Sequence, residues 1–468
     1  MDRRPDAPSA RAPAGAGARR RWRRLLVAPA AAVAIGAVVA CEPPPEGELP
    51  ALPPAMLRKS FKLDKPVKHA TAYVTALGLY ELRLNGQTVG DHRLAPEWTN
   101  YHKRVQYQAY DVTPLLQAGD NAIGAILADG WYAGRVGIVQ VTGKPPWQLR
   151  AWYGNWPHLL VQLHVTHDDG SQAVIRSDGS WKSTTDGPIR AACIIDGEQH
   201  DARRELPGWD APGFDDSTWK PVNVRPDMPP PLVWQHNEPI QATQEEKPVP
   251  ITMPSVGAYV FDFGQNVAAV CRLKIKAEPG NAIRLRHAEM LGSDGNIYRD
   301  NLRIDDKTGI GARQEAVYTC RGGGEEVWEP RFTYHGFRYV EVAGLKEKPG
   351  LDLLTARVIR SSAPETSGFI CSTPLLNKLW SNIIWTQRDN LPSIPTDCPQ
   401  RDERMGWTGD ILAFGQTAIF NMDLAAFLAK WLQDLRDDQA DDGRFADFAP
   451  HPFDPNKFKA GVCGCGTP

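Results

Sequence analysis

The sequence lacks an excess of charge of either sign. Its 468 residues hold 53 basic and 55 acidic side chains, a formal net charge of −2. Residues 1–40 carry eight arginines and two aspartates, a net charge of +6, so the remainder carries −8. A protein that binds nucleic acid needs a basic surface to neutralise phosphates. The mildly acidic body therefore excludes nucleic acid as a partner.

Long apolar runs and metal-type cysteine spacings are also missing. The apolar run at residues 25–40 has 16 residues, short of the ~20 that a transmembrane helix needs. The eight cysteines are scattered, and no CxxC pair is matched by a second Cys or His cluster, which argues against zinc. No calcium-binding loop is recognisable. We therefore expect no metal, no cofactor and mostly buried free thiols, with at most one disulfide.

The first 41 residues have the pattern of an export signal. Residues 19–24 are five arginines and a tryptophan, the run 25–40 follows, and Val38-Val39-Ala40 precedes Cys41. This order resembles the lipobox of bacterial lipoproteins, in which the cysteine is lipidated. It predicts an exported cell-envelope lipoprotein, periplasmic or on the outer surface, held to the membrane through Cys41. A plain secretory signal is the alternative, and the arginines also permit twin-arginine export.

Two β domains are expected after a Pro-rich tether at residues 42–66. Gly and Pro together make up 81 of the 468 residues, above the usual ~12%. From about residue 68 the apolar residues alternate, and Asn85-Gly86 is a strong hairpin signal. The pattern predicts two all-β domains of the sandwich or jelly-roll class, at residues 67–245 and 246–362.

Near residue 365 the apolar period changes to that of a helix. Helices are expected at residues 375–390, 407–420 and 422–439. The interval 363–468 is therefore a third, helical part of a multidomain chain.

The loop between the first two of these helices concentrates charge. It reads DCPQRDERMGWTGD over residues 397–410, with four carboxylates, two guanidiniums and a tryptophan. Arginines can hold some carboxylates ionised, while a less well partnered one near an apolar ring keeps its proton. A glycosidase needs such a carboxylic acid to protonate the leaving oxygen. A solvated charge cluster that caps a helix is the competing interpretation.

The same run resembles the signature of the bacterial α-L-rhamnosidases of glycoside hydrolase family seventy-eight. Similar motifs occur upstream at residues 80–86, 94–99, 128–134, 207–219, 261–266, 287–289 and 332–340. The resemblance covers about residues 60–460.

This resemblance implies an inverting hydrolase that removes terminal α-L-rhamnose from glycosides or polysaccharides. It implies that Glu403 is the general acid and that Asp397, Arg401 and Asp410 hold sugar hydroxyls. Trp407 would form an aromatic wall of the subsite. Asp402 is an alternative acid, although neighbouring residues on a loop usually point apart.

An inverting enzyme also needs a second carboxylate to activate water, which in this family lies late in an (α/α)6 barrel. Residues 363–468 have room only for the first helices of such a barrel, so we expect the general base to be missing. The sequence changes character after Gly461, which suggests a frameshift or premature end and a truncated, inactive enzyme. Five aspartates near the last helix are poor substitutes because they have the pattern of a solvated helix end: Asp434, Asp437, Asp438, Asp441 and Asp442. The apolar residues of that helix are expected to be largely exposed.

Two other functions stay open at this point. The chain could be a non-catalytic envelope lipoprotein that binds rhamnose or other glycans. A purely structural envelope protein is the weaker alternative, because the charged loop is retained in such detail.

Overall fold

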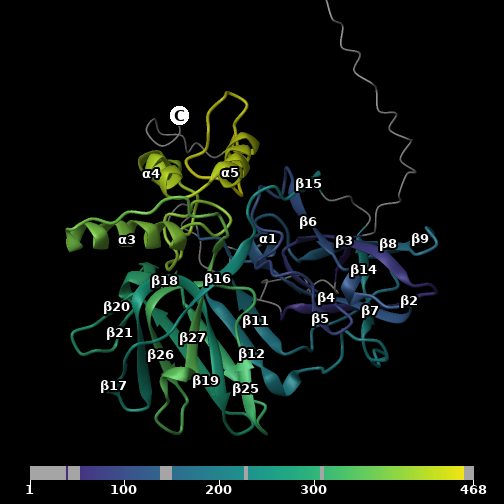
Figure 1. Cartoon of the computed structure of the whole chain (residues 1–468), viewed down its shortest axis with the longest axis horizontal. Helices are drawn as coiled ribbons and strands as arrows, with labels where there is room; N and C mark the ends of the chain where they lie inside the picture. The colour runs from purple at the N-terminus through teal and green to yellow at the C-terminus, as the bar shows by residue number, and fades with distance from the viewer. Residues whose placement is uncertain (1–37, 41–52, 138–149, 226–229, 306–309, 458–468) are drawn as a thin grey trace, which may run out of the picture. The chain divides into compact units, whose positions relative to one another are not determined.

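The computed structural model of the chain describes residues 38–40, 53–137, 150–225, 230–305 and 310–457. All of them lie within one contact unit, residues 36–468. Strands dominate as far as residue 361, and three longer helices follow (Figure 1). The predicted order of a β region before a helical region is confirmed. None of the described helices is both long and apolar enough to cross a membrane.

Two sheets form the first β region, and they face each other across a shared core. The first sheet has the order β14 (Asn223–Arg225), β1 (Val38–Ala40), β8 (His158–His167), β3 (Val67–Leu77), β6 (Val105–Asp111) and β15 (Leu232–Trp234), with β9 (Gln172–Arg176) beside β8. The second has the order β13 (Lys220–Pro221), β10 (Lys182–Thr184), β2 (Ala55–Leu63), β7 (Gly119–Ala128), β4 (Leu79–Leu84) and β5 (Gln87–Thr88). Alternate residues of both sheets, such as Val74 and Leu82, enter one buried cluster, as period-two patterning requires. Asn85 and Gly86 have φ values of 50° and 84° and form the predicted turn between β4 and β5.

A third sheet has ten strands. Its order is β11 (Ile189–Cys193), β12 (Gly197–Asp201), β24 (Glu315–Thr319), β19 (Ala282–Ala288), β26 (His335–Ala343), β18 (Ala258–Lys276), β27 (Leu354–Ser361) and β16 (Ile240–Glu246), with β17 (Ile251–Ser255) and β25 (Glu325–Trp328) also paired to β18. Short two-stranded sheets join β20 (Met290–Leu291) to β21 (Ile297–Tyr298) and β22 (Arg303–Asp305) to β23 (Ile310–Gly311). Strand β18 is long and changes partners along its length, so it ties the sheet together.

The strand pairing corrects two predicted boundaries. Residues 55–63, assigned to the tether, form β2, which pairs with β7 from Ala55 to Leu63. Its apolar residues, such as Leu57, are buried in the first core. Strands β11, β12 and β16 were assigned to the first β domain, but they pair within the ten-stranded sheet. Pairing partners this distant in sequence leave no local signal. The predicted lipidation site Cys41 and the first part of the tether, residues 42–52, lie outside the described residues.

The helical region begins with α3 (Pro374–Asp389), continues with α4 (Thr408–Asn421) and ends with α5 (Ala425–Asp437). All three helices predicted from the apolar spacing are confirmed. Leu424 and Phe427 are buried in a small helical core, and Trp431 joins the core shared with the β region. The predicted exposure of this helix is therefore wrong for these residues, although Leu432 is exposed. The exposed apolar side chains are instead concentrated on α3 and α4, at Leu375, Leu376, Leu379, Leu412, Ile419 and Phe420.

The predicted solvated helix end is also wrong in part. Asp434 and Asp438 are fully buried at the end of α5, whereas Asp441 and Asp442 are exposed. Lys430 and Arg104 surround Asp434 as ion-pair partners. These two cations allow Asp434 to be buried, whereas Asp438 accepts hydrogen bonds from the Asn100 side chain and the His451 amide.

The described cysteines, Cys193, Cys271, Cys320, Cys371 and Cys398, are all free, and three of them are buried. This agrees with the prediction of mostly free thiols for the described part of the chain.

A buried pair of histidines makes the ten-stranded sheet sensitive to acid. His287 and His335 stack with ring centroids 4.3 Å apart. Burial lowers the pKa of His287 from 6.5 to about 4, and burial together with the charge of His287 lowers the pKa of His335 further below its ordinary value. Between pH 6.5 and pH 4 the unfolded chain binds protons that the folded pair excludes, so falling pH destabilises the fold.

His335→Phe should reduce this acid sensitivity, because it removes one titrating ring. Neither ring nitrogen of His335 has a hydrogen-bond partner among the described residues, so the phenyl ring leaves no polar group unpaired. The drop in Tm between pH 7 and pH 4.5 should shrink by at least about 2 °C. His164→Phe, at a partly exposed position of β8, is the control and should leave the drop unchanged. An unchanged drop in His335→Phe would contradict the expectation.

Candidate active site

The loop between α3 and α4, residues 390–407, carries four of the five predicted site residues. We call it the acid loop. Prolines at positions 392, 395 and 399 restrict its backbone. Arg404 has a left-handed φ of 61°, a strained conformation for a residue with a side chain. Its guanidinium compensates by donating to the carbonyls of Ile194, 3.0 Å away, and Tyr334, 2.9 Å away. The ten-stranded sheet and its neighbours therefore hold the loop in shape.

Three consecutive acid-loop residues point in three directions. The Asp402 carboxylate is fully buried and pairs with Arg135. The Arg404 guanidinium lies over the Tyr334 ring, 4.8 Å from its centroid. The Glu403 side chain remains 16% exposed. Asp402 is thus engaged in a structural ion pair, and the alternative assignment of Asp402 as the acid is not supported.

Asp397, Arg401, Glu403 and Trp407 come together in the loop. The Arg401 guanidinium lies 2.5 Å from one Glu403 carboxylate oxygen and 3.5 Å from Asp397. Trp407 Nε1 donates to the other Glu403 oxygen, Oε1, over 2.9 Å. The Met405 amide donates to Asp397 Oδ1 over 2.7 Å. Asp397 therefore closes the loop, while Arg401 and Trp407 orient Glu403.

The electrostatic surroundings favour the protonated form of Glu403. Burial raises its pKa first, and the nearby charge of Asp397 raises it further. Arg401 and the Trp407 hydrogen bond act in the opposite direction without reversing the shift. Burial raises the pKa of Asp397 as well. Two half-buried carboxyl groups that share one arginine favour retention of a proton at neutral pH, which a general acid requires.

Asp410 is not part of this cluster. It lies in the first turn of α4 and is exposed. Within the described part of the chain, no hydrogen bond or ion pair joins Asp410 to the other four residues. Its predicted role in holding a sugar hydroxyl stays a prediction.

Sequence reasoning assigned no role to several residues that border the loop. Glu289 is held by Asn266 Nδ2 at 2.9 Å and lies near enough to Arg401 for that charge to lower its pKa, although burial leaves the pKa raised. Asp389, at the end of α3, accepts the Ala268 amide over 2.7 Å, and burial raises its pKa well above the ordinary value. The resemblance at residues 287–289 was the only signal for Glu289, and Asp389 had none.

Gly137 also borders the loop. A Cβ at this position would lie 2.3 Å from the Glu403 carbonyl oxygen. Only a glycine permits this close approach of the first β region to the backbone of the acid.

Asp397, Cys398 and Glu403 offer oxygen and sulfur atoms within 4.8 Å of one another. Burial raises the pKa of the Cys398 thiol to about 12, so it stays protonated and is a weak ligand. The Arg401 guanidinium already supplies the positive charge between the carboxylates. The cluster is therefore a poor fit for a metal ion.

Three family models match consecutive parts of the chain. Residues 65–244 match the alpha-L-rhamnosidase N-terminal domain, and residues 253–360 match the bacterial alpha-L-rhamnosidase concanavalin-like domain. Residues 364–463, which include the acid loop, match the bacterial alpha-L-rhamnosidase 6 hairpin glycosidase domain.

Curated relatives and solved structures are similar to this chain and carry the same family name as the three models. An alpha-L-rhamnosidase of Streptomyces avermitilis is 48% identical over 84% of this chain and 37% of its own length, and one of Formosa agariphila is 39% identical over 87% and 43%. The crystal structure of the S. avermitilis enzyme complexed with L-rhamnose has a TM-score of 0.81 at 47% identity, covering 86% of this chain and 38% of that one. The native enzyme of Aspergillus terreus has a TM-score of 0.84 at 40% identity, covering 90% and 47%.

The chain spans less than half the length of these relatives. On the strength of the three family models and these similarities, the chain belongs to the bacterial alpha-L-rhamnosidase family.

Proposed function

We propose that the protein acts on terminal α-L-rhamnose of glycosides or polysaccharides, with Glu403 as the general acid of an inverting hydrolysis. The observation that carries the proposal is the placement of Glu403, half-buried, oriented by Trp407 and Arg401 and next to a second carboxyl group. Glu403 would donate its proton to the glycosidic oxygen as that bond breaks, while a water molecule attacks the anomeric carbon from the opposite face and gives up a proton to yield free rhamnose.

The neighbouring residues take matching roles. Arg401 and Asp397 offer a donor and an acceptor to sugar hydroxyls, and the Trp407 ring offers an apolar face to the 6-deoxy sugar. Asp410, in the first turn of α4, would bind a further sugar hydroxyl. The helices α3, α4 and α5 would be the first helices of an (α/α)6 barrel.

The water-activating carboxylate is assigned to none of the aspartates near α5. Asp434 pairs with Lys430 and Arg104, Asp437 pairs with Arg104, and Asp438 accepts from Asn100. These groups are committed to holding the helix in place. In this proposal the described residues supply the acid half of the mechanism, and none of them is assigned the role of general base.

The proposed location is the cell envelope. Export through the signal at residues 1–41 and lipidation of Cys41 would remove β1 (Val38–Ala40) from the first sheet. They would place the site where rhamnose-containing polysaccharides are accessible. No metal or cofactor takes part in the proposed chemistry.

Any release of rhamnose from an aryl rhamnoside by the unsubstituted chain should fall by about a hundredfold or more in Glu403→Gln, because the amide cannot donate the required proton. Turnover would be followed by the released phenol, and L-rhamnose binding by calorimetry. Glu347→Gln, at an exposed position, is the matched control and should leave turnover unchanged. If the unsubstituted chain binds rhamnose without turnover, the glycan-binding lipoprotein replaces the hydrolase as the better description.

A further inference from the structure

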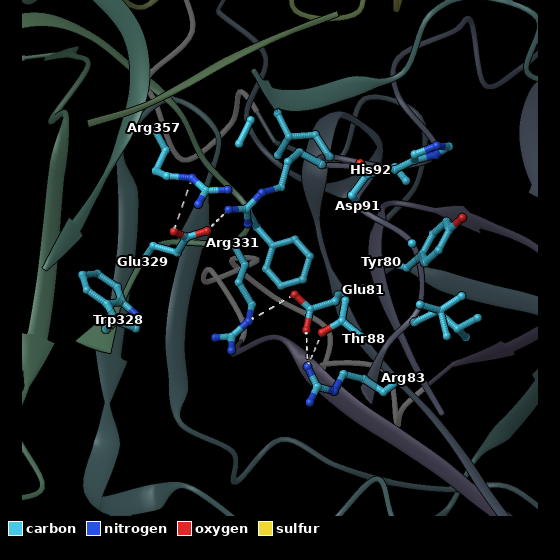
Figure 2. A pocket seen from close by; sticks show the side chains of 18 of the residues that line it. Tyr80, Glu81, Arg83, Thr88, Asp91, His92, Trp328, Glu329, Arg331 and Arg357 are labelled. Carbon is cyan, nitrogen blue, oxygen red and sulfur yellow. Dashed lines mark hydrogen bonds and ion pairs between the residues drawn. The ribbon is translucent and has the colours of Figure 1, made fainter. Parts of the chain in front are cut away.

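A cavity of about 530 Å³ lies between the first β region and the ten-stranded sheet, within the size range of small-ligand sites. One wall comes from β4 and the segment after it, and the other from β25, β27 and the segment 329–332 (Figure 2). Five arginines line it: Arg83, Arg93, Arg272, Arg331 and Arg357. We call it the arginine cavity. It contains none of the acid-loop residues.

The guanidinium groups of this cavity have more donors than partners. Each can donate five hydrogen bonds. Among the described residues, the Arg331 side chain makes only an ion pair with Glu81 at 3.2 Å. Arg93 donates once, to Glu329, and Arg357 donates once, to Glu245 over 3.1 Å. The Arg357 Nε is buried without a hydrogen-bond partner in the described structure.

These three arginines also repel one another. Burial lowers the pKa of Arg93 to about 10, and the charges of Arg357 and Arg331 add to that shift. Glu329 is shared by Arg93, Arg272 and Arg357, and Glu245 by the last two, so two carboxylates face three cations. An entering oxyanion would accept hydrogen bonds from the unused N–H groups, since a guanidinium binds an oxyanion such as carboxylate in a bidentate manner. Its negative charge would also offset the repulsion between the arginines.

The opposite wall suits hydroxyl groups. Figure 2 shows Glu81, Thr88, Asp91 and His92 on the side of the cavity across from Glu329 and Arg357. Carboxylate oxygens accept from hydroxyls, whereas Thr and His can donate or accept. A ligand that combines an anion with several hydroxyls would match both walls.

We propose that the arginine cavity is a second, non-catalytic saccharide site that binds an anionic sugar unit, one carrying a carboxylate or a sulfate. The saccharide part rests on the proposed function, because the glycan that carries the rhamnose would supply the anionic unit. The segment 331–334 connects the two sites: Arg331 and Phe332 line the cavity, and the Tyr334 carbonyl accepts from Arg404 of the acid loop.

Calorimetry of the full chain carrying Glu403→Gln tests the site without turnover. The probes are D-galacturonate, D-galactose 6-sulfate, neutral D-galactose and inorganic sulfate. We expect at least one anionic sugar to bind at least tenfold more tightly than galactose and inorganic sulfate, and added NaCl to weaken that binding. Binding of galacturonate but not of the sulfated sugar would identify a carboxylate site. Binding of the sulfated sugar but not of galacturonate would identify a sulfate site.

Arg331→Gln and Arg357→Gln should each weaken this binding at least tenfold. Arg338→Gln, which removes an arginine that pairs with Asp262 outside the cavity, should not. Arg331→Lys keeps the charge and should weaken binding less than Arg331→Gln, which keeps the test valid if the neutral variants fold poorly. Binding of inorganic sulfate as tight as that of the sugars, no preference over galactose, or indifference to both Arg→Gln changes would overturn the proposal. Galacturonate binding in a chain without rhamnosidase turnover would retain this site and reject the hydrolase.

Discussion

Asp434→Ala should lower the free energy of unfolding by about 3–5 kcal/mol, because it leaves two buried cations without their shared anion. Lys430 Nζ lies 2.9 Å from one carboxylate oxygen of Asp434, and Arg104 pairs with the other. All three side chains are buried. Burial already lowers the pKa of Lys430 against the attraction of Asp434, so the loss of the carboxylate makes its charged form still less favourable.

The same network attaches the last helix to the first β region. The Lys430 ammonium donates to the Trp98 carbonyl and, over 3.2 Å, to the Ser393 carbonyl. Asp438 accepts from Asn100 Nδ2 over 2.6 Å and from the His451 amide over 2.7 Å. We expect Asp434→Ala to release the helix, so far-UV circular dichroism and tryptophan fluorescence should both report a lower urea midpoint.

Asp442→Ala is the control, because Asp442 is 57% exposed and its ion-pair partner in the described structure is Arg444; it should lower the urea midpoint far less than Asp434→Ala, since exposed ion pairs stabilise a fold little. The double variant Lys430→Met, Asp434→Leu should recover part of the loss, since an apolar pair can replace a buried ion pair. Equal losses in Asp434→Ala and Asp442→Ala would show that burial of the network has no special cost.

Arg135→Met should also lower the free energy of unfolding by about 3–5 kcal/mol. We expect the structural change to be largest in the acid loop. Arg135 pairs with the fully buried Asp402 and binds both oxygens of Asp196, at 3.0 and 3.1 Å. Burial already raises the pKa of Asp402 against the attraction of Arg135. Without the arginine, Asp402 must either take up a proton or leave its site.

Hydrogen exchange locates the effect. The amides of Asp397 and Met405 are bonded within the loop, and both should exchange faster in Arg135→Met. Asp196→Asn is the matched control, because it removes the more exposed partner of Arg135 and leaves the Arg135–Asp402 pair intact. Asp196→Asn should lower the free energy of unfolding less than Arg135→Met and should leave the loop amides protected from hydrogen exchange. Unchanged loop exchange in Arg135→Met would mean that Asp402 is held by other contacts.

The candidate site was predictable in part because its residues are close in sequence. Residues 397, 401, 403 and 407 lie on one loop, and the spacing alone brings them near each other. The family resemblance already favoured Glu403 and left Asp402 as an alternative, but the ion pair that buries Asp402 could not be predicted, because its partner Arg135 lies 267 positions away in the chain. The placement of Glu289 beside Arg401 depends in the same way on the central sheet.

Sequence patterns were enough to predict the local features: the alternation that makes strands such as β3 and β4, the Asn85-Gly86 turn, the three helices and the charged loop between the first two. These depend on neighbouring residues, whose backbone preferences and periodicity act over short distances. The tertiary structure was needed to show that β2, β11, β12 and β16 join their sheets, that Asp434 and Asp438 are buried, and that the Glu403 side chain stays 16% exposed while Asp402 is buried. The reason is physical: strand pairing, desolvation and ion pairing depend on partners far apart in the chain, and the cost of burying a charge is set by what the fold places beside it.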